Sequence, residues 1–237
     1  TRFLDFFNWL GEISNESRDL DVHLLNFDHY KSLLDPQMSN DLNPLHNFLH
    51  LRQEQAHRQL TALLKSPEYL TALHDWEKFL KHGPEKAEAY GKKPIKRVAD
   101  KRISKTFERC LQQMLQATDS HETSQYHDLR KTCKKLRYLL EFFQSLYPED
   151  LVEALINNLK HCQDVLGEAQ DNRVYLGHLK HYRQEMEQAG VHVNTLKALD
   201  SLLEVMRKDE INISQRVIPL LQSFYTQYSQ QPILNIT

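Results

Sequence analysis

The chain has 237 residues, of which 40% are hydrophobic and 26% charged, a balance typical of folded globular proteins and not of disordered or fibrous ones. Only six glycines are present, and the Asn-Gly and Asp-Gly turns of β-hairpins are scarce, which disfavours a sheet-rich fold. No apolar run reaches the roughly 18 residues that a membrane-spanning helix needs. Neither a membrane anchor nor a signal peptide is therefore expected.

Three cysteines, Cys110, Cys133 and Cys162, lie far apart in the sequence and form no Cys-x-x-Cys motif. An odd number of scattered cysteines disfavours a disulfide framework or a zinc ribbon. We expect them to be small buried side chains in a protein of a reducing compartment, the cytoplasm.

Charge is distributed unevenly, although the net charge is only −2. The segment from Lys92 to Arg137 holds thirteen basic and five acidic residues, whereas the rest of the chain holds seventeen basic and twenty-seven acidic residues. Such segregation creates a local positive field that attracts anionic partners even when the total charge is near zero.

The spacing of apolar residues is helical along nearly the whole chain. Asp35-Pro36 predicts a break, Ser66-Pro67-Glu68 a helix start, and His82-Gly83-Pro84 a helix end. The charged stretch Glu85–Lys93 is expected to be a linker. The predicted helices are Leu10–Leu34, Leu45–Leu64, Tyr69–Lys81, Pro94–Ala117, Ser124–Leu146, Pro148–Leu166, Asn172–Ala189, Asn194–Lys208 and Ile211–Gln230.

A faint internal repeat accompanies this pattern. Residues 17–24 can be laid on residues 169–176, and in the following helices Ser66-Pro67-Glu68 falls near Glu210-Ile211-Asn212. A duplicated helical unit is the plain interpretation, because such repeats build a core by stacking similar faces. We therefore expect two helical repeats, at 1–90 and 91–237.

The most informative segment runs from His127 to Glu141. At about 100° per residue, one side of this helix is apolar and the opposite side carries basic residues with a histidine and a tyrosine among them. The apolar residues are Leu129, Cys133, Leu136, Leu140 and Phe143, and the polar side carries His127, Arg130, Lys131, Lys134, Arg137 and Tyr138.

The preceding helix repeats this arrangement. Its apolar stripe holds Ile103, Phe107, Cys110, Leu111 and Met114, opposite Arg97, Lys101, Arg102, Lys105 and Arg109. Two interpretations stay open at this point, a solvated helix face or a groove for a phosphate polymer. Arginine and lysine suit phosphate oxygens, His127 can donate hydrogen bonds to an oxyanion, and Tyr138 adds a hydroxyl. Base binding would need more exposed aromatic rings, so the pattern favours phosphates without bases.

These residues resemble a known family. The pattern His127-x-x-Arg130-Lys131-x-x-Lys134-Lys135-Leu136-Arg137-Tyr138-x-x-Glu141 is similar to the signature of the CHAD family, the conserved-histidine α-helical domain. Further segments resemble the family in the same order along the chain. They are Ser17-Arg18-Asp19-Leu20-Asp21-Val22, Leu60-x-x-Leu63-Leu64-x-Ser66-Pro67-x-Tyr69 and Leu166-Gly167-Glu168-x-x-Asp171.

The resemblance implies an all-α fold of two helical bundles, related by pseudo-twofold symmetry, around a central basic channel. It implies a non-catalytic module that binds inorganic polyphosphate, with localisation to polyphosphate granules and association with a CYTH-type triphosphate tunnel domain. Phosphate or sulfate ions are expected to fit the same site, and no catalytic residue, metal or cofactor is expected. The implied ligand-binding residues are His127, Arg130, Lys131, Lys134, Lys135, Arg137 and Tyr138, with Arg97, Lys101, Arg102 and Lys105 from the preceding helix.

Two further arginines are weaker candidates for the same site. Arg18 either contacts the ligand or forms a structural ion pair with the neighbouring aspartate. Arg52 lies on the apolar stripe of its helix, so it either reaches the channel or is paired internally.

One departure from the family concerns its first repeat, which opens with its own histidine and basic helix. By the spacing of the second repeat, that helix would lie about 44 residues before Asp19, ahead of Thr1. The first repeat is therefore expected to lack its opening helix in this chain.

Three other functions compete with polyphosphate binding. A nucleic-acid-binding helical protein would also use the cationic face, and a purely structural scaffold would bind no anion. A metal-dependent phosphohydrolase of helical fold would use His46, His50 and His57 on one helix face, or the His74-Asp75 and His127-Asp128 dipeptides. No His-Glu-x-x-His or phosphate-loop motif supports the enzyme.

Overall fold

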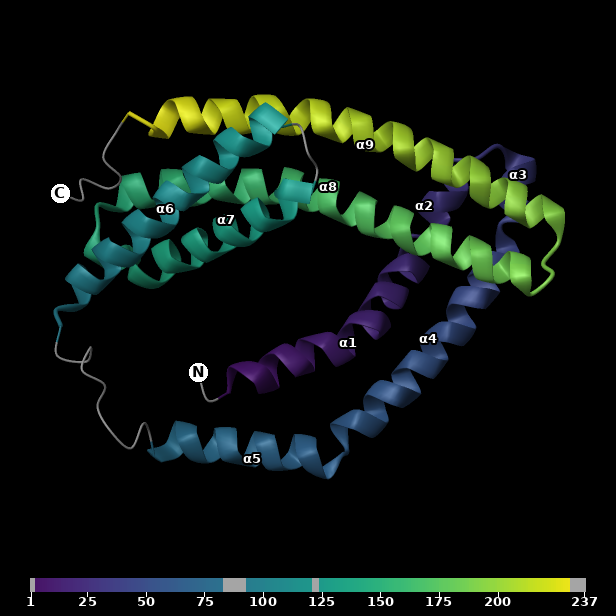
Figure 1. The fold of residues 1–237 in the computed structure, drawn as a ribbon, viewed down its shortest axis with the longest axis horizontal. Coiled ribbons are helices and arrows are strands. Elements are labelled where there is room, and N and C mark those ends of the chain that lie inside the picture. The colour runs from purple at the N-terminus through teal and green to yellow at the C-terminus, as the bar shows by residue number, and fades with distance from the viewer. Residues whose placement is uncertain (1–2, 83–92, 121–123, 231–237) are drawn as a thin grey trace. The chain divides into compact units, whose positions relative to one another are not determined.

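The structure is a computed structural model that describes residues 3–82, 93–120 and 124–230, and no strand occurs within these ranges. The expected all-α fold is confirmed (Figure 1). None of the described helices is both long and apolar enough to cross a bilayer. The helices are α1 (Leu4–Leu25), α2 (Phe27–Ser32), α3 (Pro36–Asp41), α4 (Asn43–Leu64), α5 (Pro67–His82), α6 (Ile95–Ser120), α7 (Ser124–Phe143), the 3-10 turn η2 (Gln144–Leu146), α8 (Glu149–Gln188) and α9 (Val193–Tyr228).

The helix start predicted at Ser66 is present with its cap, and the break predicted at Asp35-Pro36 is the capped start of a short helix, α3, that was not predicted. The Asp35 carboxylate accepts hydrogen bonds from the backbone N–H groups of Gln37 and Met38, both at 3.0 Å, and Pro36 begins α3. The Ser66 hydroxyl accepts the N–H of Tyr69 at 3.2 Å, at the start of α5. Side-chain caps of this kind satisfy N–H groups that have no partner within the helix. The expected linker, Glu85–Lys93, lies outside the described residues except for Lys93.

Three predicted boundaries were wrong. The helix expected to continue to Leu34 stops at Leu25, and α2 begins after Asn26. The breaks expected near Gly167 and near Glu210 do not exist, because α8 and α9 each continue through them. The apolar stripe continues across both points, so packing sustains the helix where local sequence suggested a loop.

The chain forms two compact units, each assembled from two segments. The first unit combines residues 1–89 with 179–204, and the second combines 90–178 with 205–237. Helices α8 and α9 therefore each contribute to both units. The repeats expected at 1–90 and 91–237 differ from these units, because residues 179–204 belong to the first unit. The two repeats, the pseudo-twofold symmetry and the central channel stay predictions.

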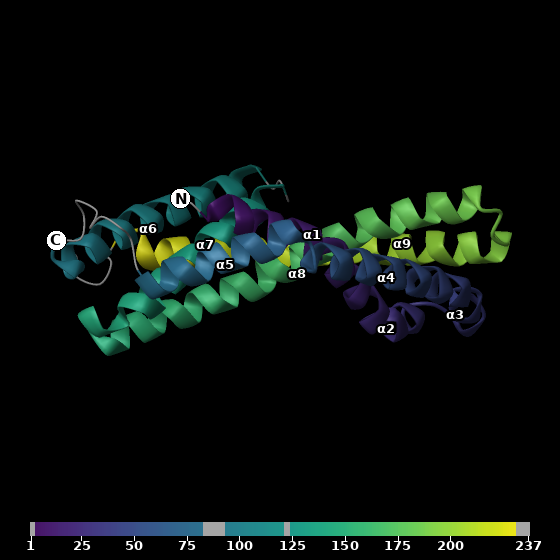
Figure 2. The ribbon, with the colours of Figure 1, turned by 90° about the horizontal axis from the view of Figure 1, so that it is seen from below.

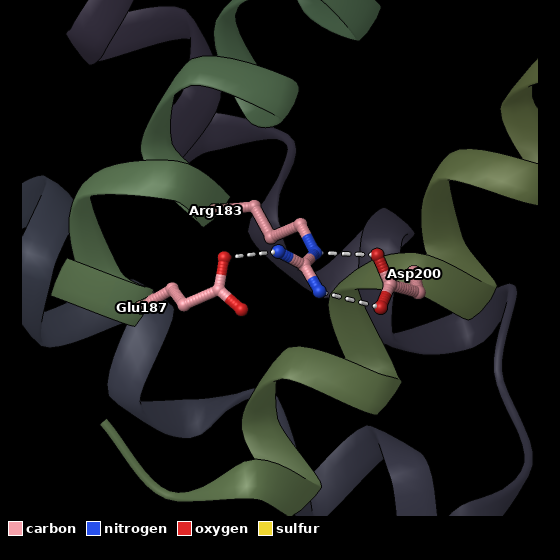
Figure 3. Close-up of polar contacts among 3 residues, drawn as sticks. All are labelled: Arg183, Glu187 and Asp200. Carbon is pink, nitrogen blue, oxygen red and sulfur yellow. Dashed lines mark hydrogen bonds and ion pairs between the residues drawn. The ribbon is translucent and has the colours of Figure 1, made fainter. Parts of the chain in front are cut away.

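In the first unit, the end of α8 and the start of α9 form a hairpin (Figure 2). Arg183 on α8 joins the two helices, because its Nε and Nη2 donate to the two carboxylate oxygens of Asp200 at 2.5 and 3.0 Å (Figure 3). Its Nη1 donates to Glu187 at 2.8 Å. This paired geometry is the strong form of the arginine–carboxylate interaction.

The core of the second unit confirms the apolar stripes that the sequence predicts for α6 and α7. Leu129, Leu136 and Leu140 are fully buried. The three cysteines are buried and free, as expected, and come from α6, α7 and α8. The Sγ atoms of Cys110 and Cys133 lie 3.5 Å apart, and burial raises the pKa of Cys162 to about 12. All three thiols thus act as small apolar side chains.

Truncation of a core residue on α7 tests this assignment of faces. Leu136→Ala should lower the free energy of unfolding by about 2–5 kcal/mol, because it leaves a cavity at a fully buried position. Leu51→Ala on α4, where the side chain is 68% exposed, is the control and should change stability by less than about 0.5 kcal/mol. Urea unfolding measures both, and equal losses would contradict the assignment.

Candidate anion-binding site

The basic residues of α6 other than Lys96 form one exposed row. They lie opposite the buried stripe of the same helix, which contains Ile103, Cys110 and Met114. A cavity of about 500 Å³ lies along the first half of this row. It is lined by Lys93, Arg97, Val98, Lys101, Arg102 and Lys105.

A second cavity, of about 240 Å³, shows that α7 contributes to the same groove. Its lining combines Arg102, Lys105, Thr106 and Arg109 of α6 with Thr132 and Lys135 of α7. Arg102 and Lys105 line both cavities, so the basic row continues from one to the other. We call the residues of the second cavity, together with Arg97 and Lys101, the α6–α7 groove.

The cations of the groove have no counter-charge within the described part of the chain. Arg97, Lys101, Arg102, Lys105, Arg109 and Lys135 form no ion pair with a described carboxylate. Elsewhere, basic side chains are commonly paired, as in Lys81–Glu77 at 2.6 Å and Arg216–Glu168 at 2.5 Å. On α6 itself, Lys96 pairs with Asp100 at 3.0 Å, outside the row. Unpaired cations facing one groove produce a positive potential that attracts an anion.

Arg130, Lys134 and Arg137 lie on the other flank of α7 and line neither cavity. The Arg130 guanidinium packs against Gly167 of α8, since a Cβ atom built on that glycine would lie 3.3 Å from Arg130 Nε. Arg137 lies 3.7 Å from Glu141 and 4.9 Å from the centre of the Tyr138 ring. The Nε atoms of both arginines are buried and have no hydrogen-bond partner in the part of the chain that the structure describes. The predicted basic side of α7 is therefore divided between two flanks.

The remaining predicted residues of α7 point to solvent. His127, Lys131 and Tyr138 are exposed, and Lys131 lies 3.5 Å from Asp128. Phe142, which sequence analysis did not single out, is 78% exposed, compared with 54% for Tyr138. Phe142 lies four residues after Tyr138, so the two rings lie on one side of the helix. That four-residue spacing from Tyr138 is the sequence signal that could have identified Phe142.

Arg18 and Arg52 belong to the first unit, and both have carboxylate partners there. Arg18 donates to the adjacent Asp19 at 3.0 Å. Arg52 donates to Glu185 at 2.7 Å, with its guanidinium 5.1 Å from the Phe48 ring centre and 5.8 Å from that of Tyr182. For Arg52, the structure supports the internally paired alternative. For Arg18, the structure shows the ion pair with Asp19, which was one of the two alternatives that the sequence allowed.

The three histidines of α4 do not gather at one point, although the His46 and His50 ring centres lie 6.5 Å apart. His46 contacts the Phe27 ring, whereas His50 lies 3.5 Å from Glu54 and His57 lies 3.2 Å from Asp21. Within the described ranges, no three histidine, cysteine or acidic residues are grouped so that they could hold a metal ion.

Comparison with protein families agrees with the sequence resemblance. The family model of the CHAD domain matches residues 1–180. The chain therefore belongs to the CHAD domain family, and the match includes α6, α7 and most of α8. A search of curated proteins finds no match.

The contact between Arg130 and Gly167 generates a stability prediction. Gly177→Ala, also in α8, should stabilise the protein by about 0.5–1 kcal/mol, because its new Cβ meets no atom within 4 Å and alanine favours the helix. Gly167→Ala should stabilise the protein less, because the Arg130 guanidinium must move to make room for the new Cβ. The full stabilisation should be recovered when Gly167→Ala is combined with Arg130→Ala. Urea unfolding of this double-mutant cycle measures the coupling, and equal effects at both glycines would contradict the contact.

Proposed function

We propose that this protein binds inorganic polyphosphate along the α6–α7 groove and performs no catalysis there. The observation that carries the proposal is the convergence on one groove of cations from two helices that have no carboxylate partner among the described residues. The family membership supports it, since CHAD domains are generally associated with polyphosphate.

The shape of the groove favours a polymer over a single ion. Arg97 and Arg109 are twelve residues apart on α6, which corresponds to about 18 Å at 1.5 Å per residue. Between them, basic side chains recur at positions 101, 102 and 105. An extended polyanion can contact all of them, whereas one phosphate contacts two or three. Guanidinium groups can hold phosphate oxygens in pairs, and lysines add point charges.

Electrostatics gives the ligand its driving force. Like charges repel even where water screens them, so the exposed cations that line the groove on α6 and α7 repel one another. A bound polyanion replaces this repulsion with attraction and releases its own counterions. The free protein tolerates the arrangement because these side chains are solvated and the apolar stripes of the same helices are buried.

The other predicted residues extend this function. His127 and Lys131 add donors on the outer side of α7, and Arg130 and Lys134 add charge along its second flank, where a long polymer would continue. We further propose a cytoplasmic protein that associates with polyphosphate granules or with a CYTH-type domain. These assignments follow from the family resemblance and from the chemistry of the groove.

Single-stranded nucleic acid is the second candidate ligand, and one observation favours it. Phe142 and Tyr138 are both exposed on α7, beside the basic residues, and exposed rings among cations can stack on bases. Neither ring lines the groove cavities, however. Among the described residues that line it, the groove therefore offers cations for phosphate and no aromatic ring for a base.

Charge reversal in the groove tests the proposed function. Arg109→Glu with Lys135→Glu, one change on each helix, should abolish measurable polyphosphate binding while leaving helicity and melting nearly unchanged. Arg58→Glu with Lys65→Glu is the matched control, because it changes the net charge equally at exposed positions of the first unit. Isothermal titration at several salt concentrations measures both. Unchanged binding by the groove variant would contradict the proposal.

Competition separates the two candidate ligands. Labelled polyphosphate bound to the protein should resist displacement by single-stranded RNA at equal phosphate concentration, at both low and high salt. Both ligands should weaken with salt through counterion release. Preferential displacement by RNA, lost on combining Tyr138→Ala with Phe142→Ala, would instead identify a nucleic-acid-binding protein.

A further inference from the structure

Asp100 is an acidic residue within the basic part of α6, close to the start of the α6–α7 groove. No other acidic residue lies within four positions of Arg97 in the sequence. At about 100° per residue, Asp100 lies between Lys96 and Arg97 around the helix, about 40° from the first and 60° from the second. Residues three and four apart on a helix are neighbours. The carboxylate therefore has two basic side chains within reach, one outside the groove and one in it.

The carboxylate pairs with the cation outside the groove. Lys96 Nζ donates to Asp100 Oδ1 at 3.0 Å, whereas Arg97 forms no ion pair with a carboxylate of the described residues. Tyr147, in the turn between α7 and α8, favours this choice, because its hydroxyl donates to the same Oδ1 at 2.8 Å. Lys96 Nζ also lies 4.6 Å from the centre of the Tyr147 ring. Lys96, Asp100 and Tyr147 thus form one cluster on the side of α6 away from Arg97.

Tyr147 is held in place by the local sequence and by burial. Its backbone is extended, with φ −134° and ψ 163°, which is the conformation that a following proline favours, here Pro148. Its N–H donates to the carbonyl of Gln144 at 3.2 Å. The residue is only 9% exposed and belongs to the core of the second unit. The Tyr147 hydroxyl is therefore a fixed donor beside α6, to which the more mobile carboxylate of Asp100 can turn.

The charge of Asp100 makes its direction important for the ligand. Partial burial by itself would raise the pKa of this carboxyl, but the hydrogen bonds from Lys96 and Tyr147 hold its pKa below its usual value. The group is therefore a carboxylate at neutral pH. A carboxylate repels a polyanion and attracts a free guanidinium. If it turned toward Arg97, it would neutralise the first arginine of the groove and compete with the ligand for that side chain.

We infer that Tyr147 is a positioning residue for polyphosphate binding, which together with Lys96 holds the Asp100 carboxylate away from Arg97. Arg97 thereby keeps its charge for the ligand. The inference rests on the proposed function, because the effect on binding requires that Arg97 contacts the ligand. It gives a role to a buried aromatic residue that lines neither cavity of the groove.

Isothermal titration of the full chain with polyphosphate tests the inference. Tyr147→Phe should weaken binding by about two- to fivefold, the effect of one exposed ion pair. The dependence of affinity on salt should also show about one phosphate contact fewer. Tyr228→Phe is the matched control, because it removes a hydroxyl that accepts a hydrogen bond from Asn158 at 2.6 Å, between α8 and α9 of the same unit. The control should bind as tightly as the wild-type chain.

Asp100→Asn separates this positioning role from a purely structural one. Added to Tyr147→Phe, it should restore the lost affinity, because no carboxylate then remains to pair with Arg97. In the wild-type chain it should raise the affinity much less, because the carboxylate is already turned away. Equal effects in the two backgrounds would show that Tyr147 acts only by holding α6 in place, and this result would overturn the inference. Unchanged binding by Tyr147→Phe would overturn it too.

Nuclear magnetic resonance of the ligand-free protein gives a readout that does not depend on polyphosphate. The Nε–Hε signal of Arg97 should shift in Tyr147→Phe, as its ion pair with Asp100 forms, and should return when Asp100→Asn is added. An Arg97 signal that is the same in Tyr147→Phe and in the wild-type chain would refute the positioning role. A wild-type chain that binds no polyphosphate but shows these shifts would contradict the proposed function alone.

Discussion

The antiparallel packing of α6 and α7 is the constraint on which the site depends. Each helix buries an apolar stripe in the core of the second unit, and that burial fixes where the opposite flanks point. Arg102, Lys105 and Arg109 are thereby held against Lys135, although like charges would separate if the helices were free. The free energy that holds these cations together comes from the leucines and thiols beneath them, at roughly 25 cal/mol per Å² of apolar surface buried. Binding capacity is thus a by-product of hydrophobic packing.

The structure separates two kinds of arginine that a count of charges treats alike. Arg52 and Arg183 have carboxylate partners within hydrogen-bond distance and join one helix to another. Arg102 and Arg109 have no such partner in the described ranges and face a groove. An arginine of the first kind stabilises the fold, and its charge is already neutralised. Only the second kind retains an unsatisfied positive field that a ligand can use.

The sequence was a good guide wherever one helix determines the answer. The stripe through Leu129, Leu136 and Leu140 and its opposite basic side follow from a period of 3.6 residues. It was a poor guide wherever a second helix decides. Nothing local shows that Gly167 receives the Arg130 side chain within a continuous α8, or that Lys135 and not Arg130 lies on the flank of α7 that faces the groove. Glycine next to an acidic residue resembles a loop until the helix packed against it is known.

The CHAD match ends at residue 180, but the folded unit does not end there. Val217, Leu221 and Phe224 of α9 lie in one core with α6 and α7, and Asn172 on α8 donates to the carbonyl of Met206 at 3.0 Å. If the chain consisted of the matched segment alone, α9 would be missing and the core beneath it would be exposed. The groove therefore depends on residues well outside the matched segment, because α9 helps hold α6 and α7 in place. The family match thus contains the helices of the binding surface, α6 and α7, whereas part of what stabilises that surface, α9, lies outside the match.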